Sequence, residues 1–486
     1  MLLLFIPLRT LVSFGNAVCP FPYGGIRDKT ILLLRALKAV LPLVGLAGLL
    51  WTLAPGRLRK AVCRLVDREI GDGKWTLPAI LVLAAVLRLG WILCFPTQLY
   101  AESTWYFEKA AQIAGGYGYV YDLQSRNPTA AWPVGYPVFL ALFFLITGPS
   151  ILVAKLLNVL LSIAVVYLSY LITSWLLDRR VAWISALLLA ILPGLIVYVG
   201  LVSSDLLFMA LVLAAFALSL RPVVGDRPPR RLVLLNPLLV GVIAGGAALT
   251  RPPGLVLIAF WAFVRVLTGR SEWPSLWRWA SLVVVGALVV LAPWCIRNYI
   301  HFRRFVPISN NGGANFWIGN NPLAYGGYIF PRDDSNPLAA LIGDEVALDE
   351  AGYRLGMEFI RQNPVPVLRL LPAKVFYLYN SNDAGLGWNC SAATQPGQRG
   401  SGPRAFMLVN LVYTCTAFFG LLGLAVMALN FRYVRPVAWS GVILTLYWTL
   451  AQLPFFGSDR FSLPLLPILT TYAAGGISAL LRVDAD

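Results

Sequence analysis

The sequence predicts an all-α polytopic membrane protein with two long outer loops. Hydrophobic residues make up 58% of the 486 residues and charged residues only 13%, whereas an ordinary soluble domain carries about 25% charged residues. Several apolar runs reach the roughly 20 residues that a helix needs to cross a bilayer. The basic residues lie mostly in short loops between these runs. The net charge of +17 is therefore explained by membrane topology, and no nucleic-acid partner is expected.

Ten stretches are apolar enough to cross a bilayer as helices, with approximate limits 76–96, 150–177, 181–199, 203–220, 233–249, 254–268, 280–296, 405–429, 437–454 and 463–481. Basic residues gather in alternating loops, at 57–74, 178–180 and 221–231 and then at Arg270, Arg278, Arg432 and Arg435. The positive-inside rule places these loops in the cytoplasm. The intervening loops are then expected outside, and they are 97–149, 200–204, 250–253, 297–404 and 455–462.

The chain is expected to divide into four segments. They are an accessory N-terminal membrane-associated segment (1–73), a transmembrane core (74–296), a large outer loop (297–404) and C-terminal transmembrane helices (405–486). Within the first segment, the run 31–54 fits either one span or an interfacial helix. Loop 97–149 is aromatic, and its apolar tail 137–147 is too short to span, which predicts a juxtamembrane or re-entrant helix. The second loop is expected to be partly structured.

An acidic residue stands just beyond the first confident span. Glu102 begins the pattern Glu102-x-x-x-Tyr106-x-x-x-Ala110, which places three side chains on one helical face. A carboxylate held at the membrane surface can take a proton from an acceptor hydroxyl, a role typically worth about 10²- to 10⁴-fold in rate. A solvated or salt-bridged surface acid is the alternative interpretation of the same pattern.

Five basic residues fall in outer loops or at outer helix ends: Arg126, Arg251, Arg297, Lys374 and Arg460. Cations beside a leaving phosphate stabilise the negative charge that builds up there, and the donor fork of arginine suits this role. Headgroup anchoring or a structural ion pair explains any single one of them equally well. Arg251 and Arg297 adjoin apolar segments, where an unpaired charge is costly.

Metal and thiol chemistry have little support in the sequence. Glu102, Asp122 and Asp205 show no recognisable ligand spacing, so a divalent cation stays open and no other cofactor is expected. The single histidine, His301, argues against a histidine-rich metal site. The six cysteines show no CxxC spacing, although one disulfide between Cys295 and Cys390 is possible near the outer face.

Seven segments occur in an order that resembles glycosyltransferase family 39 and its bacterial relatives, which include protein O-mannosyltransferases and the lipid A aminoarabinose transferase. They are Glu102-x-x-x-Tyr106 with Ala110 and Gly115-Gly116, Pro128 to Pro137, Ser204-Asp205, Thr250 to Gly254, Pro293 to Asn298, Ser309 to Pro322, and Arg460 to Pro467. They extend over residues from about 76 to 480. The chain departs from the family in carrying Glu102 where aspartate is usual, Ala101 in place of an adjacent acid, and Val134 in a Pro-Pro-Gly motif.

This resemblance implies a GT-C-type bundle in the bacterial inner membrane, with its site facing the periplasm. It implies an inverting transfer from a polyprenyl-phosphate sugar to a protein, lipid A or glycan acceptor. Glu102 would act as the base, and Arg251, Arg297 and Arg460 would hold the phosphate, with Arg126 and Lys374 as further candidates. Tyr106, Trp132 and Tyr136 would line the cleft, and amides such as Asn298 and Asn315 would bind the substrate.

Two other functions are considered. A transporter or flippase of lipid-linked saccharides would need outer cations too, but it predicts pseudo-symmetric halves and charges at mid-membrane, and neither is evident in the sequence. A non-catalytic subunit of polysaccharide assembly predicts no turnover by the purified protein. The identity of the sugar and of the acceptor stays open.

Overall fold

The computed structural model describes residues 76–224, 230–255, 257, 260, 273–329, 336–393, 403–432 and 434–482. Over this part of the chain the regular structure is helical, and extended pairing is limited to isolated bridges at Thr97–Ala393 and Val120–Pro128. The all-α prediction is therefore confirmed. The accessory segment 1–73 and most of the predicted span 254–268 lie outside the described residues.

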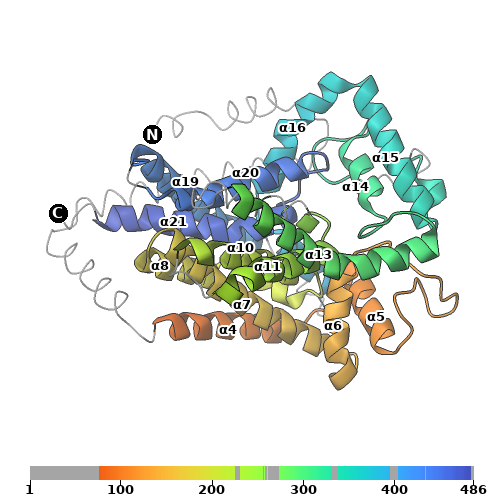
Figure 1. The fold of residues 1–486 in the computed structure, drawn as a ribbon, viewed down its shortest axis with the longest axis horizontal. Helices are drawn as coiled ribbons and strands as arrows, with labels where there is room; N and C mark the ends of the chain where they lie inside the picture. Colours follow the sequence, from red (N-terminus) through yellow and green to blue (C-terminus); the bar gives the residue numbers. More distant parts are fainter. Residues whose placement is uncertain are drawn as a thin grey trace.

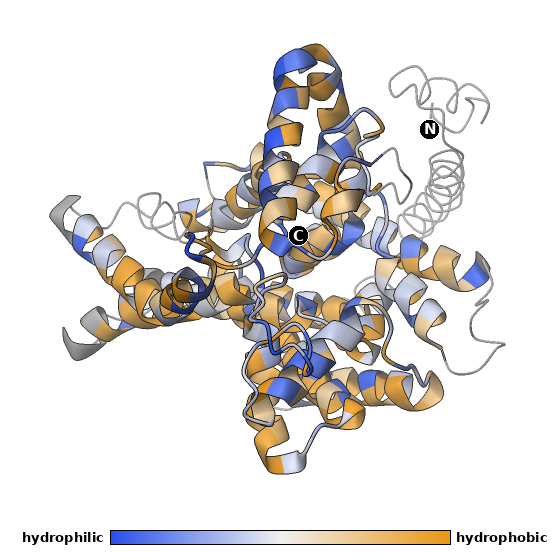
Figure 2. Cartoon of the chain, turned by 90° about the vertical axis from the view of Figure 1, so that its right-hand side faces the viewer, coloured by the Kyte–Doolittle hydropathy of each residue, from blue (hydrophilic) through white to orange (hydrophobic). Residues whose placement is uncertain are grey.

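Five helical segments among the described residues are long and apolar enough to cross a membrane, and they are Thr76–Cys94, Ile151–Leu176, Leu276–Phe302, Arg404–Leu429 and Asp459–Leu481. They belong to α4 (Thr76–Cys94), α7 (Ile151–Leu176), α13 (Trp273–Phe302), α19 (Pro403–Leu429), and η5 (Asp459–Leu465) with α21 (Leu466–Arg482). Shorter apolar stretches lie in α10 (Asp205–Val224) and α11 (Arg230–Thr250), and η4 (Pro436–Trp439) leads into α20 (Ser440–Gln452). Hydrophobic residues dominate the bundle. The helices at the top of Figure 2 carry both hydrophilic and hydrophobic residues.

The predicted span 181–199 is broken in the structure. It forms α8 (Arg179–Ile191), followed after a bend of 59° by α9 (Pro193–Ile196) and η2 (Val197–Gly200). Proline has no backbone N–H, so the helical ladder loses a donor where Pro193 follows α8. The break turns η2 toward the outer end of the bundle, beside the start of α10.

A fully buried arginine on α4 compensates this break. Arg88 is 0% exposed, and its Nη1 donates to the carbonyl of Ala190 at 2.8 Å while its Nη2 reaches that of Leu189 at 3.4 Å. Its Nε donates to Ser162 Oγ at 2.6 Å. The carbonyl of Leu189 is the one that an N–H at Pro193 would have paired with in an unbroken helix. The guanidinium therefore caps the carboxyl end of α8.

Both long outer loops contain helices, as predicted. The first carries α5 (Glu102–Ala114) and α6 (Gly135–Thr147), and the second carries α14 (Gly312–Gly319), η3 (Ala339–Leu341), α15 (Glu345–Gln362), α16 (Pro364–Tyr379) and α17 (Ala384–Ala392). Figure 1 shows α5, α6, α14, α15 and α16 together at one end of the bundle, with the C-terminus at the other end. The outer loops thus form one lobe over one end of the helices.

The structure corrects two expectations about the outer loops. The helix predicted at 280–296 extends to Phe302 in α13, so Arg297 and Asn298 lie in a helix and the second loop begins after them. Arg297 stays helical because neighbouring backbone carbonyls accept its hydrogen bonds, as described below. Cys295 and Cys390 are not joined by a disulfide.

Candidate active site

The acid predicted from the sequence begins α5. Glu102 is the first residue of this helix and is only 8% exposed. Ala101, just before it, has a φ of 49°, a left-handed value that typically costs a non-glycine residue about 1–3 kcal/mol. Such strain persists only where the surrounding packing imposes it. Here it accompanies a carboxylate that points into the protein.

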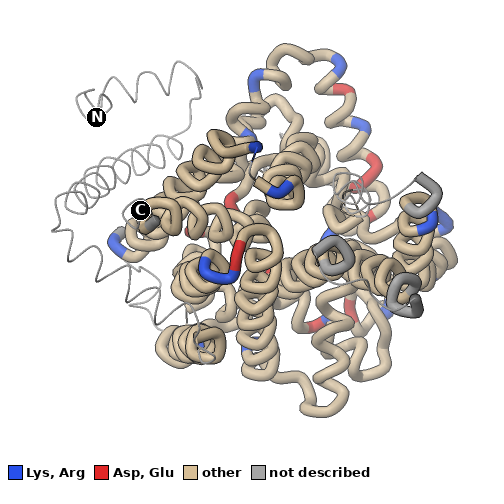
Figure 3. The backbone as a smooth tube through the Cα atoms, turned by 60° about the vertical axis from the view of Figure 1, so that its left-hand side comes forward, with Lys and Arg blue, Asp and Glu red and all other residues tan. Residues whose placement is uncertain are grey.

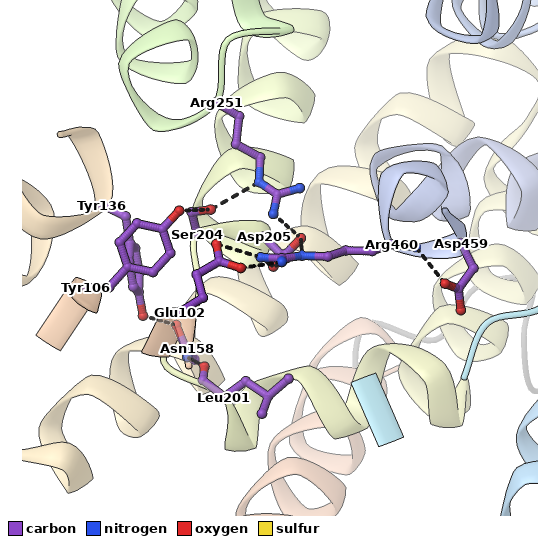
Figure 4. Close-up of polar contacts among 10 residues, drawn as sticks. All are labelled: Glu102, Tyr106, Tyr136, Asn158, Leu201, Ser204, Asp205, Arg251, Asp459 and Arg460. Carbon is purple, nitrogen blue, oxygen red and sulfur yellow. Dashed lines mark hydrogen bonds and ion pairs between the residues drawn. The ribbon is translucent and has the colours of Figure 1, made fainter. Parts of the chain in front are cut away.

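A second buried acid shares the same arginine. Arg460, in η5, donates from Nη1 and Nη2 to the two oxygens of Glu102, the latter at 2.9 Å. Its Nε and Nη2 donate to Asp205, at 3.1 and 2.8 Å. Asp205 is the first residue of α10 and is 2% exposed. One guanidinium thus lies between two carboxylates, with all three nitrogens engaged (Figure 4).

A second arginine binds the far side of Asp205. Arg251 Nη2 lies 2.8 Å from Asp205 Oδ1, and Arg251 Nε donates to Ser204 Oγ at 3.0 Å. The hydroxyl of Tyr106 lies 3.2 Å from the same Ser204 oxygen. The charges alternate in the order Glu102, Arg460, Asp205, Arg251, which we call the ion-pair chain. Two positive and two negative groups balance each other, so it can be buried without a net charge.

A close contact between two helices positions Arg251. A Cβ atom added to Gly135, the first residue of α6, would lie 2.7 Å from the backbone nitrogen of Thr250. Only glycine permits this approach. The start of α6 therefore packs against the end of α11, immediately before Arg251. Gly135 belongs to the motif Pro128 to Pro137 of the first outer loop, so this motif makes the contact with α11.

Three aromatic residues predicted for the cleft lie together beside the ion-pair chain. Tyr106 packs edge-on against Tyr136 and Trp132, with ring centroids 5.3 and 5.9 Å apart. The hydroxyl of Tyr136 donates to Asn158 Oδ1 at 3.2 Å, and Asn158 Nδ2 donates to the carbonyl of Leu201 at 2.6 Å. Burial and the nearby Glu102 charge raise the pKa of Tyr106 well above its ordinary value, so its phenol stays protonated.

Two of the predicted site residues instead bind the backbone. Arg297 donates to the carbonyls of Thr129 and Tyr119, at 2.8 and 2.7 Å. Asn298 donates to the carbonyl of Val306 at 2.9 Å. These bonds connect the end of α13 to the first outer loop and to the chain that follows the helix. In this structure both residues shape the lobe and neither joins the ion-pair chain.

The other three predicted residues also lie elsewhere. Lys374, on α16, donates to Asn320 Oδ1 and to the carbonyl of Leu453, at 3.1 and 3.0 Å. Arg126 is exposed, and its guanidinium lies 5.5 Å from the ring centre of Tyr117. Asn315 is part of α14 in the second loop. None of these described contacts reaches the acids.

Two residues of the site were not assigned from the sequence. Asp205 was noted as part of a Ser-Asp pair and as an acid without metal-ligand spacing, although an acid opening an apolar membrane helix is itself a signal of function. Trp388, on α17, lies with its ring centre 5.3 Å from the Arg460 guanidinium. Trp388 lies far from the other site residues in the sequence, so the sequence did not indicate this contact. Together with Glu102, Asp205 and Arg460 it lines a cavity of only about 10 Å³, too small for a sugar.

The described residues around the ion-pair chain do not form a metal site. Among the described residues, no group of three or more His, Cys, Asp or Glu side chains gathers where a metal ion could bind. Glu102 and Asp205 are the two carboxylates of the site, and the Arg460 guanidinium lies between them. This donor set does not fit the divalent cation that the sequence left open, since hard cations require several oxygen ligands.

Residues 131–296 match the family described as dolichyl-phosphate-mannose-protein mannosyltransferase. The resemblance to glycosyltransferase family 39 is confirmed. The matched segment includes Tyr136, Asp205 and Arg251, and the match supports a membrane glycosyltransferase. Glu102 and Arg460 lie outside the matched residues. No curated protein matches the sequence.

Solved structures resemble the fold. The oligosaccharyltransferase of Archaeoglobus fulgidus matches in its apo form (TM-score 0.50, 16% identity) and tethered to an acceptor peptide with the NVT sequon (TM-score 0.50, 17% identity). Each match covers 84% of this chain and 50% of the other, so the chain spans about half the length of that protein. ArnT from Cupriavidus metallidurans, bound to undecaprenyl phosphate, matches at a TM-score of 0.41 and 14% identity, covering 84% and 78% of the two chains. The predicted GT-C fold is confirmed.

Proposed function

We propose that this protein is a glycosyltransferase that moves a sugar from a polyprenyl-phosphate carrier to an acceptor hydroxyl on the extracytoplasmic side of the membrane. The observation that carries the proposal is the buried ion-pair chain from Glu102 to Arg251. It lies beside the rings of Tyr106, Trp132 and Tyr136, which we call the aromatic wall. It combines a base and two guanidinium groups at the outer-loop end of the bundle. The family match supports the donor class, because its description names dolichyl-phosphate mannose.

In the proposed reaction, the acceptor oxygen attacks the anomeric carbon of the sugar from the face opposite the phosphate. The new glycosidic bond forms as the bond between that carbon and the phosphate oxygen breaks, and its electron pair stays on the phosphate. Glu102 takes the hydroxyl proton. The configuration at the anomeric carbon is inverted, and the carrier leaves as a polyprenyl phosphate with one additional negative charge.

The two arginines have different roles in this scheme. Arg251 has described bonds from Nε and Nη2, and its side chain is 14% exposed, so we assign the bound phosphodiester to its remaining donors. Arg460 is held by both carboxylates in this structure. Once donor binding has separated Arg460 from Glu102, protonation of Glu102 removes the anion that would draw the guanidinium back, while the leaving phosphate gains a charge. The guanidinium then stabilises the phosphate.

The aromatic wall serves the sugar and the lipid. Tyr106, Trp132 and Tyr136 lie between the first outer loop and the ion-pair chain, where an apolar carrier and a sugar ring both find contact surface. The cavity is closed in the present state, because Glu102 and Arg460 bind each other across it. Donor binding must therefore separate this pair. A protein, a lipid A or a glycan hydroxyl serves equally as the acceptor in this chemistry.

The test is a transfer assay with purified protein in lipid vesicles. Radiolabelled polyprenyl-phosphate sugars are added with membrane extract as the acceptor source, and label leaving the carrier is measured. Glu102→Gln should lower the transfer rate by about 10²- to 10⁴-fold, since the amide cannot take the proton. Glu108→Gln is the matched control, because Glu108 is exposed on the same helix. Full transfer by a correctly inserted Glu102→Gln protein would end the assignment.

The same assay separates the two alternative functions. A flippase would carry labelled donor across the vesicle membrane with the sugar still attached to its carrier. A non-catalytic subunit would leave the donor intact on its original side. Either outcome with the purified wild-type protein rejects the proposed transfer.

A further inference from the structure

A second cavity lies at the end of the bundle opposite the ion-pair chain. It measures about 390 Å³, within the range of roughly 300–1,000 Å³ that is typical of small-molecule sites. The ends of α7, α19 and α21, the start of α8, and η4 with the residues before it surround it. Its walls are mostly apolar or small, with Leu177, Gly423, Met427, Gly475 and Ala479 among the lining residues.

Ser478 and Arg435 are two polar residues of this cavity. Ser478 lines the cavity and is 3% exposed, and its buried hydroxyl has no hydrogen-bond partner among the described residues. A buried hydroxyl without a partner costs free energy unless a ligand or water binds it. Arg435 lies at the mouth, where its Nη2 donates to the carbonyls of Trp175 and Leu177 at 3.0 and 2.7 Å. Those bonds orient the guanidinium and use only one of its nitrogens.

The surroundings of the cavity favour an anionic ligand. Four arginines occur in the two loops at this end, namely Arg179, Arg180, Arg432 and Arg435. The acid among the lining residues, Asp178, accepts a hydrogen bond from the Val181 nitrogen and caps the start of α8. Figure 3 shows basic residues at this end, near the C-terminus. By the positive-inside rule it is the cytosolic end, which faces anionic lipid headgroups.

We propose that this cavity binds an anionic glycerophospholipid, with its phosphate on Arg435, its glycerol region near Ser478 and an acyl chain along the apolar wall. Arg435 selects the headgroup, and the apolar lining accepts the chain. Bound there, the lipid contacts α7, α19, η4 and α21 at once. It would stabilise the bundle from the side opposite the transfer site.

The test measures lipid binding and needs no transfer activity, so its failure is distinct from failure of the proposed function. Purified protein is titrated with phosphatidylglycerol or phosphatidylcholine, and bound lipid is counted by native mass spectrometry. Phosphatidylglycerol should bind roughly tenfold more tightly or better, as expected for a charge-assisted hydrogen bond. Arg435→Gln should abolish this preference, because glutamine can still donate to the carbonyls but carries no charge.

Arg432→Gln is the matched control, because it removes the same charge from an exposed residue of the same loop that does not line the cavity. It should keep the preference. Gly475→Leu should weaken both lipids, since a Cβ there meets only Leu177 at an ordinary 3.6 Å and a longer side chain fills the space. Equal binding of both lipids, equal effects of the two arginine variants, or binding of neither lipid would overturn the proposal. Should Gly475→Leu fail to insert, the arginine pair still decides.

Discussion

Arg460 and Glu102 are 358 positions apart in the sequence, and their side chains form a two-point ion pair in the structure. The base of the proposed reaction is therefore held by the same group that would stabilise its leaving phosphate. Both oxygens of Glu102 accept hydrogen bonds from this guanidinium, so neither is free to take the hydroxyl proton until the guanidinium moves. The pair thus couples donor binding to release of the base.

Replacing Arg460 with lysine tests this coupling. Lysine keeps the charge but cannot bind two carboxylates through a planar fork. The expected result for Arg460→Lys is a fall in transfer rate of roughly 10²- to 10³-fold, comparable to the loss of one donor to a developing anion. Arg432→Lys, on an exposed loop at the other end, should transfer at the wild-type rate. Equal rates for all three proteins would contradict the assigned role.

Asp205→Asn should destabilise the protein as well as inactivate it. The substitution removes the carboxylate that binds Arg251 and leaves Arg460 with Glu102 alone, and breaking a buried ion pair typically costs about 3–5 kcal/mol. Thermal unfolding in detergent measures the loss of stability, and the transfer assay measures the loss of rate. Asp122→Asn is the control, because Asp122 lies in an outer-loop turn and bonds Ser125. If Asp205→Asn unfolds at the wild-type temperature, the ion-pair chain is not a stabilising element.

Arg88→Met should lower the unfolding temperature, because the carbonyls of Leu189 and Ala190 then lose their donor inside the membrane. A buried acceptor without a partner costs about 1–3 kcal/mol. Adding Pro193→Ala to Arg88→Met should recover part of the loss, since alanine brings an N–H to the Leu189 carbonyl. A double variant less stable than Arg88→Met would show that Arg88 does not act as a helix cap.

We expect the stability of the protein to depend on pH through Lys374. Burial lowers the pKa of Lys374 from 10.5 to about 8, and its side chain lies in the outer lobe. Between these values the unfolded chain binds more protons than the native one, so the free energy of unfolding rises with pH from about 8 to 10.5. The rise amounts to roughly 3 kcal/mol at most. Unfolding of the wild type and of Lys374→Met across this pH range gives the comparison, and parallel profiles would refute the prediction.

The helices were predictable because each apolar run is a local property of the sequence. Short motifs in family order singled out Glu102, Arg251 and Arg460 as site candidates, and the structure places the three in one ion-pair chain. The partner of each could not be predicted, since the contact between Arg460 and Asp205 joins residues 255 positions apart. Arg297 and Lys374 looked like phosphate ligands because cations near the outer face share one sequence signal. Only the packing of the lobe shows that backbone carbonyls and an amide accept their hydrogen bonds.

Arg460 follows the other members of the ion-pair chain in the sequence, and this order has a consequence for biosynthesis. Glu102, Asp205 and Arg251 are synthesised first, and Arg460 emerges from the ribosome only after them. Until then Arg251 is the one arginine of the ion-pair chain beside the two acids, and a partly synthesised protein lacks the assembled centre. Translation must therefore pass residue 460 before the proposed chemistry can begin, and a product truncated before residue 460 would be an inert and poorly stable membrane protein.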